Sequence, residues 1–181
     1  VSFSYEADSQ VKALAHISFL APQGKVTAVV GPSGGGKSTI ANLISRFYDV
    51  TDGSIQIGGV DLRDIPLDTL MDKVSFVFQD TFLFKQSIMD NIRMGNPDAT
   101  EEQVIAAAKA ARCHEFIEQL PNGYQTVIGS TGVHLSGGER QRIAIARAIV
   151  KDAPIIVLDE ATAFSDPENE YLIQKAFEKL I

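Results

Sequence analysis

The first residues suited to chemistry form a glycine-rich run, GPSGGGKS at 31–38. This run matches the pattern G-x-x-x-x-G-K-[ST]. In this pattern the glycines let backbone N–H groups curl around phosphate oxygens, and the start of the following helix adds donors and a favourable dipole. Lys37 can reach the β- and γ-phosphates of a nucleotide, and the Ser38 hydroxyl can ligate Mg²⁺. The alternative is a glycine-rich turn without a ligand, which the flanking pattern of strand and helix disfavours.

A second candidate is the acidic pair that ends the run IIVLDE at 155–160. The apolar residues predict a buried strand, and open α/β sheets bind their ligands at the carboxyl ends of such strands. Asp159 is therefore predicted to hold the Mg²⁺ shell, through water, and Glu160 to orient or deprotonate an attacking water. An acidic pair can also simply end a strand.

The third candidate is LSGGE at 135–139. Ser136 and Glu139 have the spacing of a capping box, and Gly137 and Gly138 permit close approach of another backbone. The residues alone leave two interpretations open: an ordinary helix start, or a second phosphate-binding helix N-terminus.

Strands and helices alternate around these candidates. Residues 1–30 read as strands with a turn at Pro22-Gln23-Gly24, and Val26–Val30 is predicted to be a strand buried on both faces. A helix is expected from Lys37 to about Phe47, with an apolar face that comprises Ile40, Leu43, Ile44 and Phe47. Residues 51–60 have the character of a hairpin.

The second half of the chain is predicted to be mainly helical between two strands. Val74–Phe78 reads as a strand, a capping box at Thr100 opens a helix to about Ala111, and the one at Ser136 opens a helix to about Val150. This pattern predicts an α/β fold with a mostly parallel central sheet. Residues 80–150 look like a helical insertion between core segments 1–79 and 151–181.

Composition excludes several classes of protein. The chain has 181 residues, is 45% hydrophobic and carries a net charge of −7, so we expect one ordinary domain without a nucleic-acid surface. Its single cysteine, Cys113, allows no internal disulfide. No apolar stretch approaches the roughly 20 residues of a membrane span. Both ends look cut, and we expect a fragment of a longer protein.

LSGGERQR at 135–142, together with the motifs at 31–38 and 155–160 in this order, closely resembles the ATP-binding cassette (ABC) family, and the resemblance covers essentially the whole chain. It implies a P-loop NTPase (RecA-like) core with an N-terminal antiparallel β subdomain. It also implies that Mg-ATP is held between two such domains, identical or different, arranged head to tail. Ser136 and Gly138 would then contact the γ-phosphate bound by the opposite domain.

Other residues match the family's pattern one by one. Tyr5 resembles the aromatic that stacks on adenine, although Phe3 on the same face leaves a plain strand residue as the alternative. Gln79 resembles the glutamine that senses Mg²⁺ and links the site to a membrane subunit. Asp166 resembles an aspartate of the loop that crosses the dimer, where Ala163 replaces the usual serine. The nucleotide-binding set implied in this way is Tyr5, Gly31, Ser33, Gly34, Gly35, Gly36, Lys37, Ser38, Thr39, Gln79, Ser136, Gly138 and Asp159. Within it, Lys37 and Gln79 join Glu160 as catalytic candidates, and Ser38, Gln79 and Asp159 are the metal candidates.

Two further features bear on the type of ABC protein. DTFLFKQSIMDNI at 80–92 resembles export-type cassettes, in which this region packs against the transmembrane domain, so Phe82, Leu83 and Phe84 are contact candidates, with a place in the core as the alternative. The family also has a histidine beyond the LDE motif, whereas all three histidines here precede Asp159. The chain thus stops before that histidine, and the isolated fragment should hydrolyse ATP weakly or not at all.

The leading hypothesis is an ATPase domain that powers an export-type membrane transporter. Its transmembrane domain would lie on the same chain or another subunit, and this soluble part would sit at the cytoplasmic face of the cell membrane. The alternative is an ABC ATPase without transport, either regulatory or associated with DNA or ribosomes. The short stretch between Gln79 and Ser136 leaves no room for the long coiled coil of some DNA-associated members, and the acidity disfavours ribosome binding.

Overall fold

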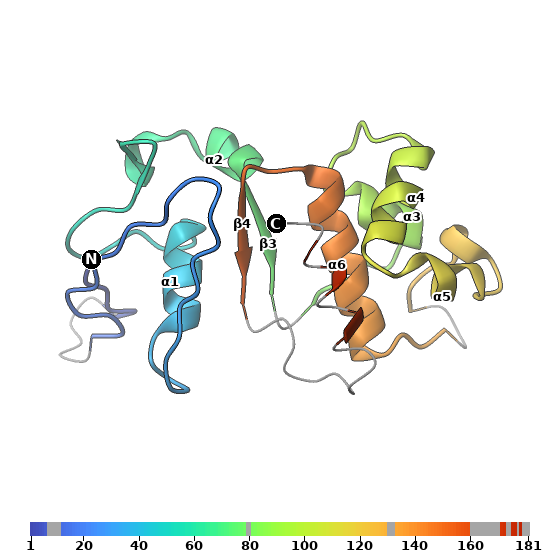
Figure 1. Ribbon diagram of the computed structural model, residues 1–181, viewed down its shortest axis with the longest axis horizontal. Helices are drawn as coiled ribbons and strands as arrows, with labels where there is room; N and C mark the ends of the chain where they lie inside the picture. Colours follow the sequence, from blue (N-terminus) through green and yellow to red (C-terminus); the bar gives the residue numbers. More distant parts are fainter. Residues whose placement is uncertain are drawn as a thin grey trace. The chain divides into compact units, whose positions relative to one another are not determined.

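The computed structural model describes residues 1–6, 12–78, 81–129, 133–159, 171–172, 175–176 and 178. The chain divides into two compact units, Val1–Val74 and Ser75–Ile181. Helices and short strands occur along both, including one pair of parallel strands (Figure 1). The predicted α/β class is therefore confirmed at this coarse level.

The helix that follows the glycine-rich run, α1, spans Lys37–Ile44. It is shorter than predicted, because Arg46 has a left-handed φ of 54° and the N–H groups of Arg46 and Phe47 turn back to the carbonyls of Leu43 and Asn42, at 3.1 and 3.0 Å. Phe47 lies beyond the end and is exposed rather than part of the apolar face. Leu43 is buried and packs with Phe3 and Leu14 in a small core.

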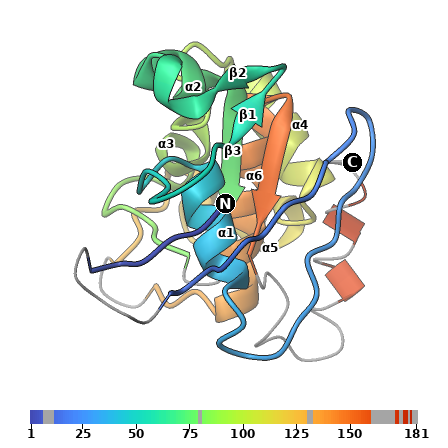
Figure 2. The ribbon, with the colours of Figure 1, turned by 90° about the vertical axis from the view of Figure 1, so that its left-hand side faces the viewer.

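The rest of the first unit contains a hairpin and short helices. Strands β1 (Gln56–Ile57) and β2 (Val60–Asp61) pair antiparallel, as the sequence predicted, and Figure 2 shows them near α2. Both residues of the turn, Gly58 and Gly59, have positive φ, at 58° and 82°, which is the conformation that two-residue hairpins favour. The 3-10 helix η1 spans Leu62–Asp64, and helix α2 spans Leu67–Lys73.

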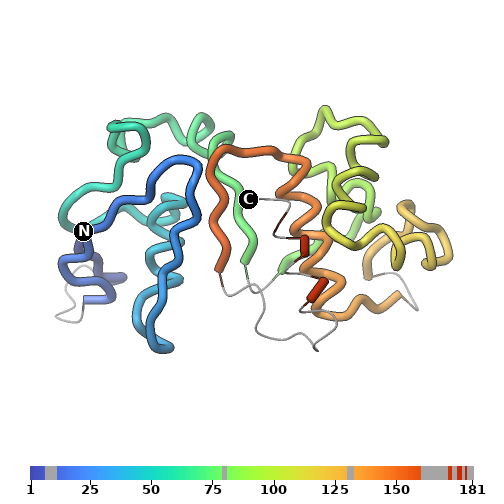
Figure 3. The backbone as a smooth tube through the Cα atoms, viewed as in Figure 1, coloured from blue at the N-terminus to red at the C-terminus, as the bar shows by residue number. Residues whose placement is uncertain are grey.

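The N-terminal segment has less strand than predicted. Ser2 bridges Asp52 and Phe3 bridges Leu14, both antiparallel. Residues 26–30 instead form extended chain outside any strand (Figure 3), and Val30 is 90% exposed, so the prediction of a doubly buried strand there is wrong. β-Branched residues favour an extended backbone, but a strand also needs hydrogen-bonding neighbours, and none of the described residues forms a ladder with this run.

Strands β3 (Val74–Val77) and β4 (Ile155–Leu158) form a two-stranded sheet and run in the same direction (Figure 1). Both were predicted, although β4 is only partly buried. The helices of the second unit are α3 (Ile88–Arg93), α4 (Glu101–Ala110), α5 (His114–Glu118), the 3-10 helix η2 (Gly123–Gln125) and α6 (Gly137–Lys151). These helices occupy the range that the sequence predicted to be mainly helical. In the described part of the chain, every helix is too short or too polar to cross a membrane.

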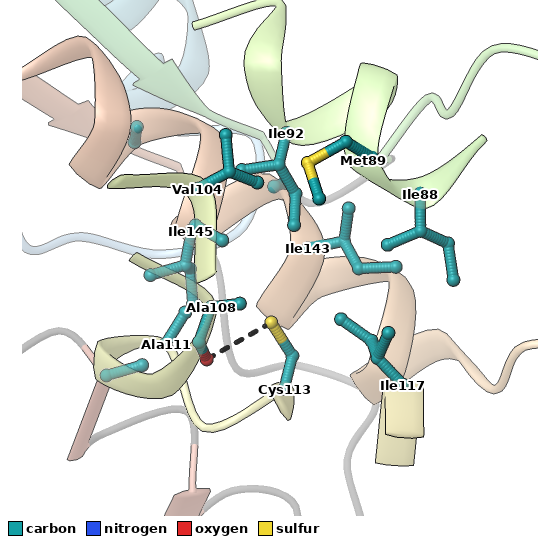
Figure 4. Packing of buried hydrophobic residues seen from close by; sticks show 14 of the residues in the cluster. Ile88, Met89, Ile92, Val104, Ala108, Ala111, Cys113, Ile117, Ile143 and Ile145 are labelled. Atoms are coloured by element: carbon teal, nitrogen blue, oxygen red, sulfur yellow. Dashed lines mark hydrogen bonds between the residues drawn. The ribbon is translucent and has the colours of Figure 1, made fainter. Parts of the chain in front are cut away.

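The core of the second unit lies around α6 (Figure 4). Ile143 and Ile145 of α6 are fully buried against Ile88 and Ile92 of α3 and Val104 of α4. Cys113 is also buried there, and its thiol donates to the Ala108 carbonyl at 3.3 Å. Burial raises the pKa of the Cys113 thiol to about 12, so it is an inert core residue. This packing holds α6 firmly in place.

Candidate nucleotide-binding site

The run at 31–38 forms an open turn whose shape depends on glycine. Gly34 and Gly36 have φ values of 76° and 86°, in the left-handed region that side chains rarely adopt. A Cβ atom at Gly36 would also come within 2.5 Å of the Leu14 Cδ2 atom and 3.0 Å of the Ala13 carbonyl oxygen. Gly36 is therefore required both by its backbone conformation and by the packing beneath it.

Lys37 closes this turn on itself. Its Nζ donates to the carbonyl oxygens of Gly31 at 3.0 Å and Pro32 at 2.9 Å, so a positive charge lies at the mouth of the loop. The first turn of α1 contains no acidic residue, and its N-terminal dipole favours an anion. An exposed glycine loop, a lysine ammonium and a helix N-terminus together fit a phosphate group.

Tyr5 stands next to the helix that leaves this loop. Its hydroxyl and the Thr39 Oγ1 atom are 3.0 Å apart, and the Tyr5 ring is 53% exposed. Phe3 and Tyr48 both pack edge-on against it, with ring centroids at 4.9 and 5.2 Å. Tyr48 was not predicted to join this cluster, because nothing in the local pattern connects it with the N-terminal residues. The arrangement leaves part of an aromatic ring open for a flat ligand such as a nucleobase.

Asp159 follows directly on β4, and its backbone N–H donates to the Val77 carbonyl at 3.0 Å. The carboxylate therefore lies at the carboxyl end of both parallel strands, as predicted. The Ser38 hydroxyl and the Asp159 carboxylate are hard oxygen ligands, the kind that Mg²⁺ prefers. The predicted residues Gln79, Glu160 and Asp166 lie outside the described residues.

Ser136 caps helix α6 in the predicted way. Its hydroxyl accepts the Glu139 N–H at 3.2 Å, and its own N–H donates to the Glu139 carboxylate at 2.7 Å. The capping box is complete, which confirms the helix-start interpretation. Ser136 and Gly137 are exposed, and a Cβ at Gly137 would meet nothing within 4 Å. This helix N-terminus is thus capped, and it is accessible to a ligand at Ser136 and Gly137, whereas the predicted contact residue Gly138 is buried.

Comparison with known proteins gives consistent matches. A family model described as "ABC transporter" matches residues 14–163. The chain is 51% identical over 181 residues to the ATP-dependent lipid A-core flippase of Desulfotalea psychrophila, covering 100% of this chain and 31% of the relative. The flippase of the same name from Mannheimia succiniciproducens is 52% identical over 181 residues, covering 99% and 31%. The mycobactin import ATP-binding/permease protein IrtA of Mycolicibacterium smegmatis is 50% identical over 180 residues, covering 99% and 21%. The chain spans less than a third of the length of each of these relatives.

Proposed function

The chain belongs to the ABC transporter family, and we propose that it is an ATP-hydrolysing domain that powers a membrane transporter of export type. In this proposal it binds Mg-ATP and closes head to tail with a second such domain. The observation that carries this proposal is the loop at 31–38. It has two left-handed glycines and the Lys37 ammonium at the start of α1, and no acidic residue in that helix's first turn. These features favour binding of the β- and γ-phosphates.

The proposed roles follow the chemistry of the residues. Lys37 and the backbone N–H groups of the loop hold the phosphates, and Tyr5 packs against the adenine. Ser38, Gln79 and Asp159 hold Mg²⁺, which when bound neutralises phosphate charge. Glu160 orients the attacking water and accepts its proton.

The second domain completes the site in this proposal. Ser136 and Gly138 of one domain approach the γ-phosphate on the other, and Asp166 lies in the loop that crosses between them. The exposure of Ser136 and Gly137 at the N-terminus of α6 supports this role, because this end of the helix offers donors to the charge that develops during hydrolysis. Residues 1–79 and 151–181 form the nucleotide core in this scheme, and residues 80–150 form the helical part that carries the signature sequence.

The proposed partner is a transmembrane domain, on the same polypeptide or another subunit, which places this domain at the cytoplasmic face of the cell membrane. Two relatives support a membrane partner by name, one as an ATP-binding/permease protein and one as a flippase. The exposed Phe82 and Phe84 provide an apolar contact for it.

The proposal is tested by Glu160→Gln in the complete protein. Loss of the base should lower kcat by a factor of about 100 or more, leave the Kd for Mg-ATP within about threefold, and accumulate a nucleotide-bound pair of domains. Glu115→Gln, an exposed position on α5, is the matched control and should behave as wild type. Hydrolysis that continues at the wild-type rate in Glu160→Gln would remove Glu160 from this role.

A further inference from the structure

Arg147, in the second half of α6, bonds to α3 and to the segment that precedes α3. Its Nε donates to the Asn91 backbone carbonyl at 2.9 Å, its Nη2 to the Asn91 side-chain Oδ1 at 3.2 Å, and its Nη1 to the Phe82 carbonyl at 3.3 Å. A planar guanidinium can hold these acceptors together because its donors have a fixed fork geometry. One side chain of α6, the helix that begins with the LSGGE sequence and is called the signature helix below, is thus bonded to both ends of the segment 82–91.

Asn91 in turn forms hydrogen bonds with other residues of this segment. Its side chain is fully buried, and its Oδ1 also accepts the Phe84 N–H at 2.9 Å. Its Nδ2 donates to the carbonyl oxygens of Phe84 and Ser87, both at 3.0 Å. The amide is therefore satisfied at both ends, and a buried network of this kind holds a single conformation.

The far side of the segment is also fixed. The Ile88 N–H donates to the Thr126 carbonyl and the Ile128 N–H to the Gln86 carbonyl, each at 3.0 Å. These bonds flank an antiparallel bridge between Ser87 and Val127. Residues 82–88 are thus held between α6 and the chain that leads toward the start of that same helix.

The segment held in this way carries two exposed aromatic rings. Phe82 is 68% exposed and Phe84 is 43% exposed, and their rings meet edge-on with centroids 4.9 Å apart. Two large apolar side chains side by side on the surface are typical of a contact with another protein element. Their carbonyls, rather than their rings, are what Arg147 and Asn91 hold.

We infer that Arg147 is a positioning residue that fastens the Phe82–Phe84 pair to the signature helix, so that a displacement of α6 on nucleotide binding moves the pair with it. The inference rests on the proposed function, in which the N-terminus of α6 contacts the nucleotide and the aromatic pair contacts a membrane partner. Lysine replaces Arg147 only in part, because a single ammonium does not hold the acceptors on Asn91 and Phe82 in one plane.

The test uses Arg147→Met and Arg147→Lys in the complete protein reconstituted in lipid vesicles. Arg93→Met is the matched control, because Arg93 also donates to a backbone carbonyl of this unit, that of Ala99 at 3.2 Å, without bonding to residues 82–87. Hydrogen exchange of the amides of residues 82–87 is measured first, without nucleotide. We expect exchange about tenfold or more faster in Arg147→Met, an intermediate rate in Arg147→Lys and the wild-type rate in Arg93→Met.

The second readout is steady-state hydrolysis of Mg-ATP. Because the nucleotide contacts are intact, the KM should stay within about twofold, while kcat falls about fivefold in Arg147→Met and less in Arg147→Lys. Addition of Mg-ATP should also change exchange at residues 82–87 in the wild-type protein and leave it unchanged in Arg147→Met.

Two results would overturn the inference. Unchanged exchange in both variants would mean that Arg147 does not hold the segment, and faster exchange with wild-type kcat would mean that no motion passes through it. If Arg147→Met does not fold, Arg147→Lys supplies the same readouts. A wild-type protein that neither binds nor hydrolyses Mg-ATP would contradict the proposed function instead. The hydrogen exchange measured without nucleotide would still show whether Arg147 holds the aromatic pair in place.

Discussion

The Tyr5 hydroxyl lies 3.0 Å from Thr39 Oγ1, which joins an N-terminal aromatic ring to the helix that leaves the glycine loop. Thr39 is buried, whereas the Tyr5 ring remains about half exposed. This hydrogen bond and the edge-on contacts with Phe3 and Tyr48 orient a ring next to the candidate phosphate site. The ring and the bond can be removed separately.

We expect Tyr5→Ala to weaken Mg-ATP binding about tenfold, because stacking on a base contributes roughly 1–3 kcal/mol. Tyr5→Phe keeps the ring and loses only the bond to Thr39, so its Kd should rise by no more than about threefold. Calorimetric titration of both variants measures the difference. Phe19→Ala, at another exposed aromatic of the same unit, controls for a general loss of apolar surface and should bind as wild type. Equal losses in Tyr5→Ala and Phe19→Ala would contradict the adenine role.

The two left-handed glycines of the loop provide a matched pair. An alanine at Gly34 meets no atom within 4 Å and should cost only backbone strain, about 1 kcal/mol of unfolding free energy. An alanine at Gly36 adds a clash with the Leu14 side chain and the Ala13 carbonyl, so the cost should rise to about 2–3 kcal/mol. Urea unfolding of both variants tests this order, and equal costs would show that the packing under Gly36 is not tight.

Ser136 combines a structural and a proposed chemical role, which substitution can separate. Ser136→Ala removes the cap of α6 and should lower the unfolding free energy by about 1 kcal/mol. Ser136→Asp restores a good cap but places a negative charge where the γ-phosphate is proposed to bind. Its stability should therefore match wild type while ATP-driven pairing of the domains is lost, as measured by light scattering of the Glu160→Gln background. Normal pairing in Ser136→Asp would leave Ser136 with the capping role alone.

Burial of Cys113 predicts a loss of stability at alkaline pH. Its pKa rises from 9.0 to about 12, chiefly through desolvation, so the folded protein keeps the thiol protonated where the unfolded chain has lost the proton. The contribution of Cys113 to the free energy of unfolding is therefore fully present below pH 9 and is lost as the pH rises toward 12. At pH 10 the decline should be about 1 kcal/mol relative to pH 8. Urea unfolding at both pH values measures it, and Cys113→Ala should show a shallower fall. An identical slope in the variant would contradict the assignment.

Local chemistry made some elements predictable from the sequence. The capping boxes at Thr100 and Ser136 and the Gly58-Gly59 turn all formed as expected, because each depends on residues within four positions of one another. The strand expected at Val26–Val30 was wrong, since β-branched residues specify extended backbone but not a ladder partner. The end of α1 was also misplaced, because Phe47 continues the apolar period while the left-handed backbone at Arg46 ends the helix.

The candidate site also has features that the sequence predicts and features that it does not. The loop at Gly34 and Gly36 and the start of α1 at Lys37 could be predicted from spacing alone, because this geometry is set within one short segment. Tyr48 beside Tyr5, and Arg147 on Asn91, are contacts between residues distant along the chain. No periodicity or spacing in one sequence specifies such pairs, since they depend on how the elements pack.

The central claim is that the loop at 31–38 holds the phosphates of Mg-ATP, and calorimetric titration of the complete protein with Mg-ATP tests it most directly. Lys37→Ala removes the ammonium that now bonds to Gly31 and Pro32, and Lys25→Ala removes an exposed charge of the same unit as control. Loss of a charged hydrogen-bond donor should raise the Kd about ten- to a hundredfold in Lys37→Ala, with Lys25→Ala unchanged. A Lys37→Ala protein that remains folded and binds Mg-ATP as tightly as wild type would contradict the account.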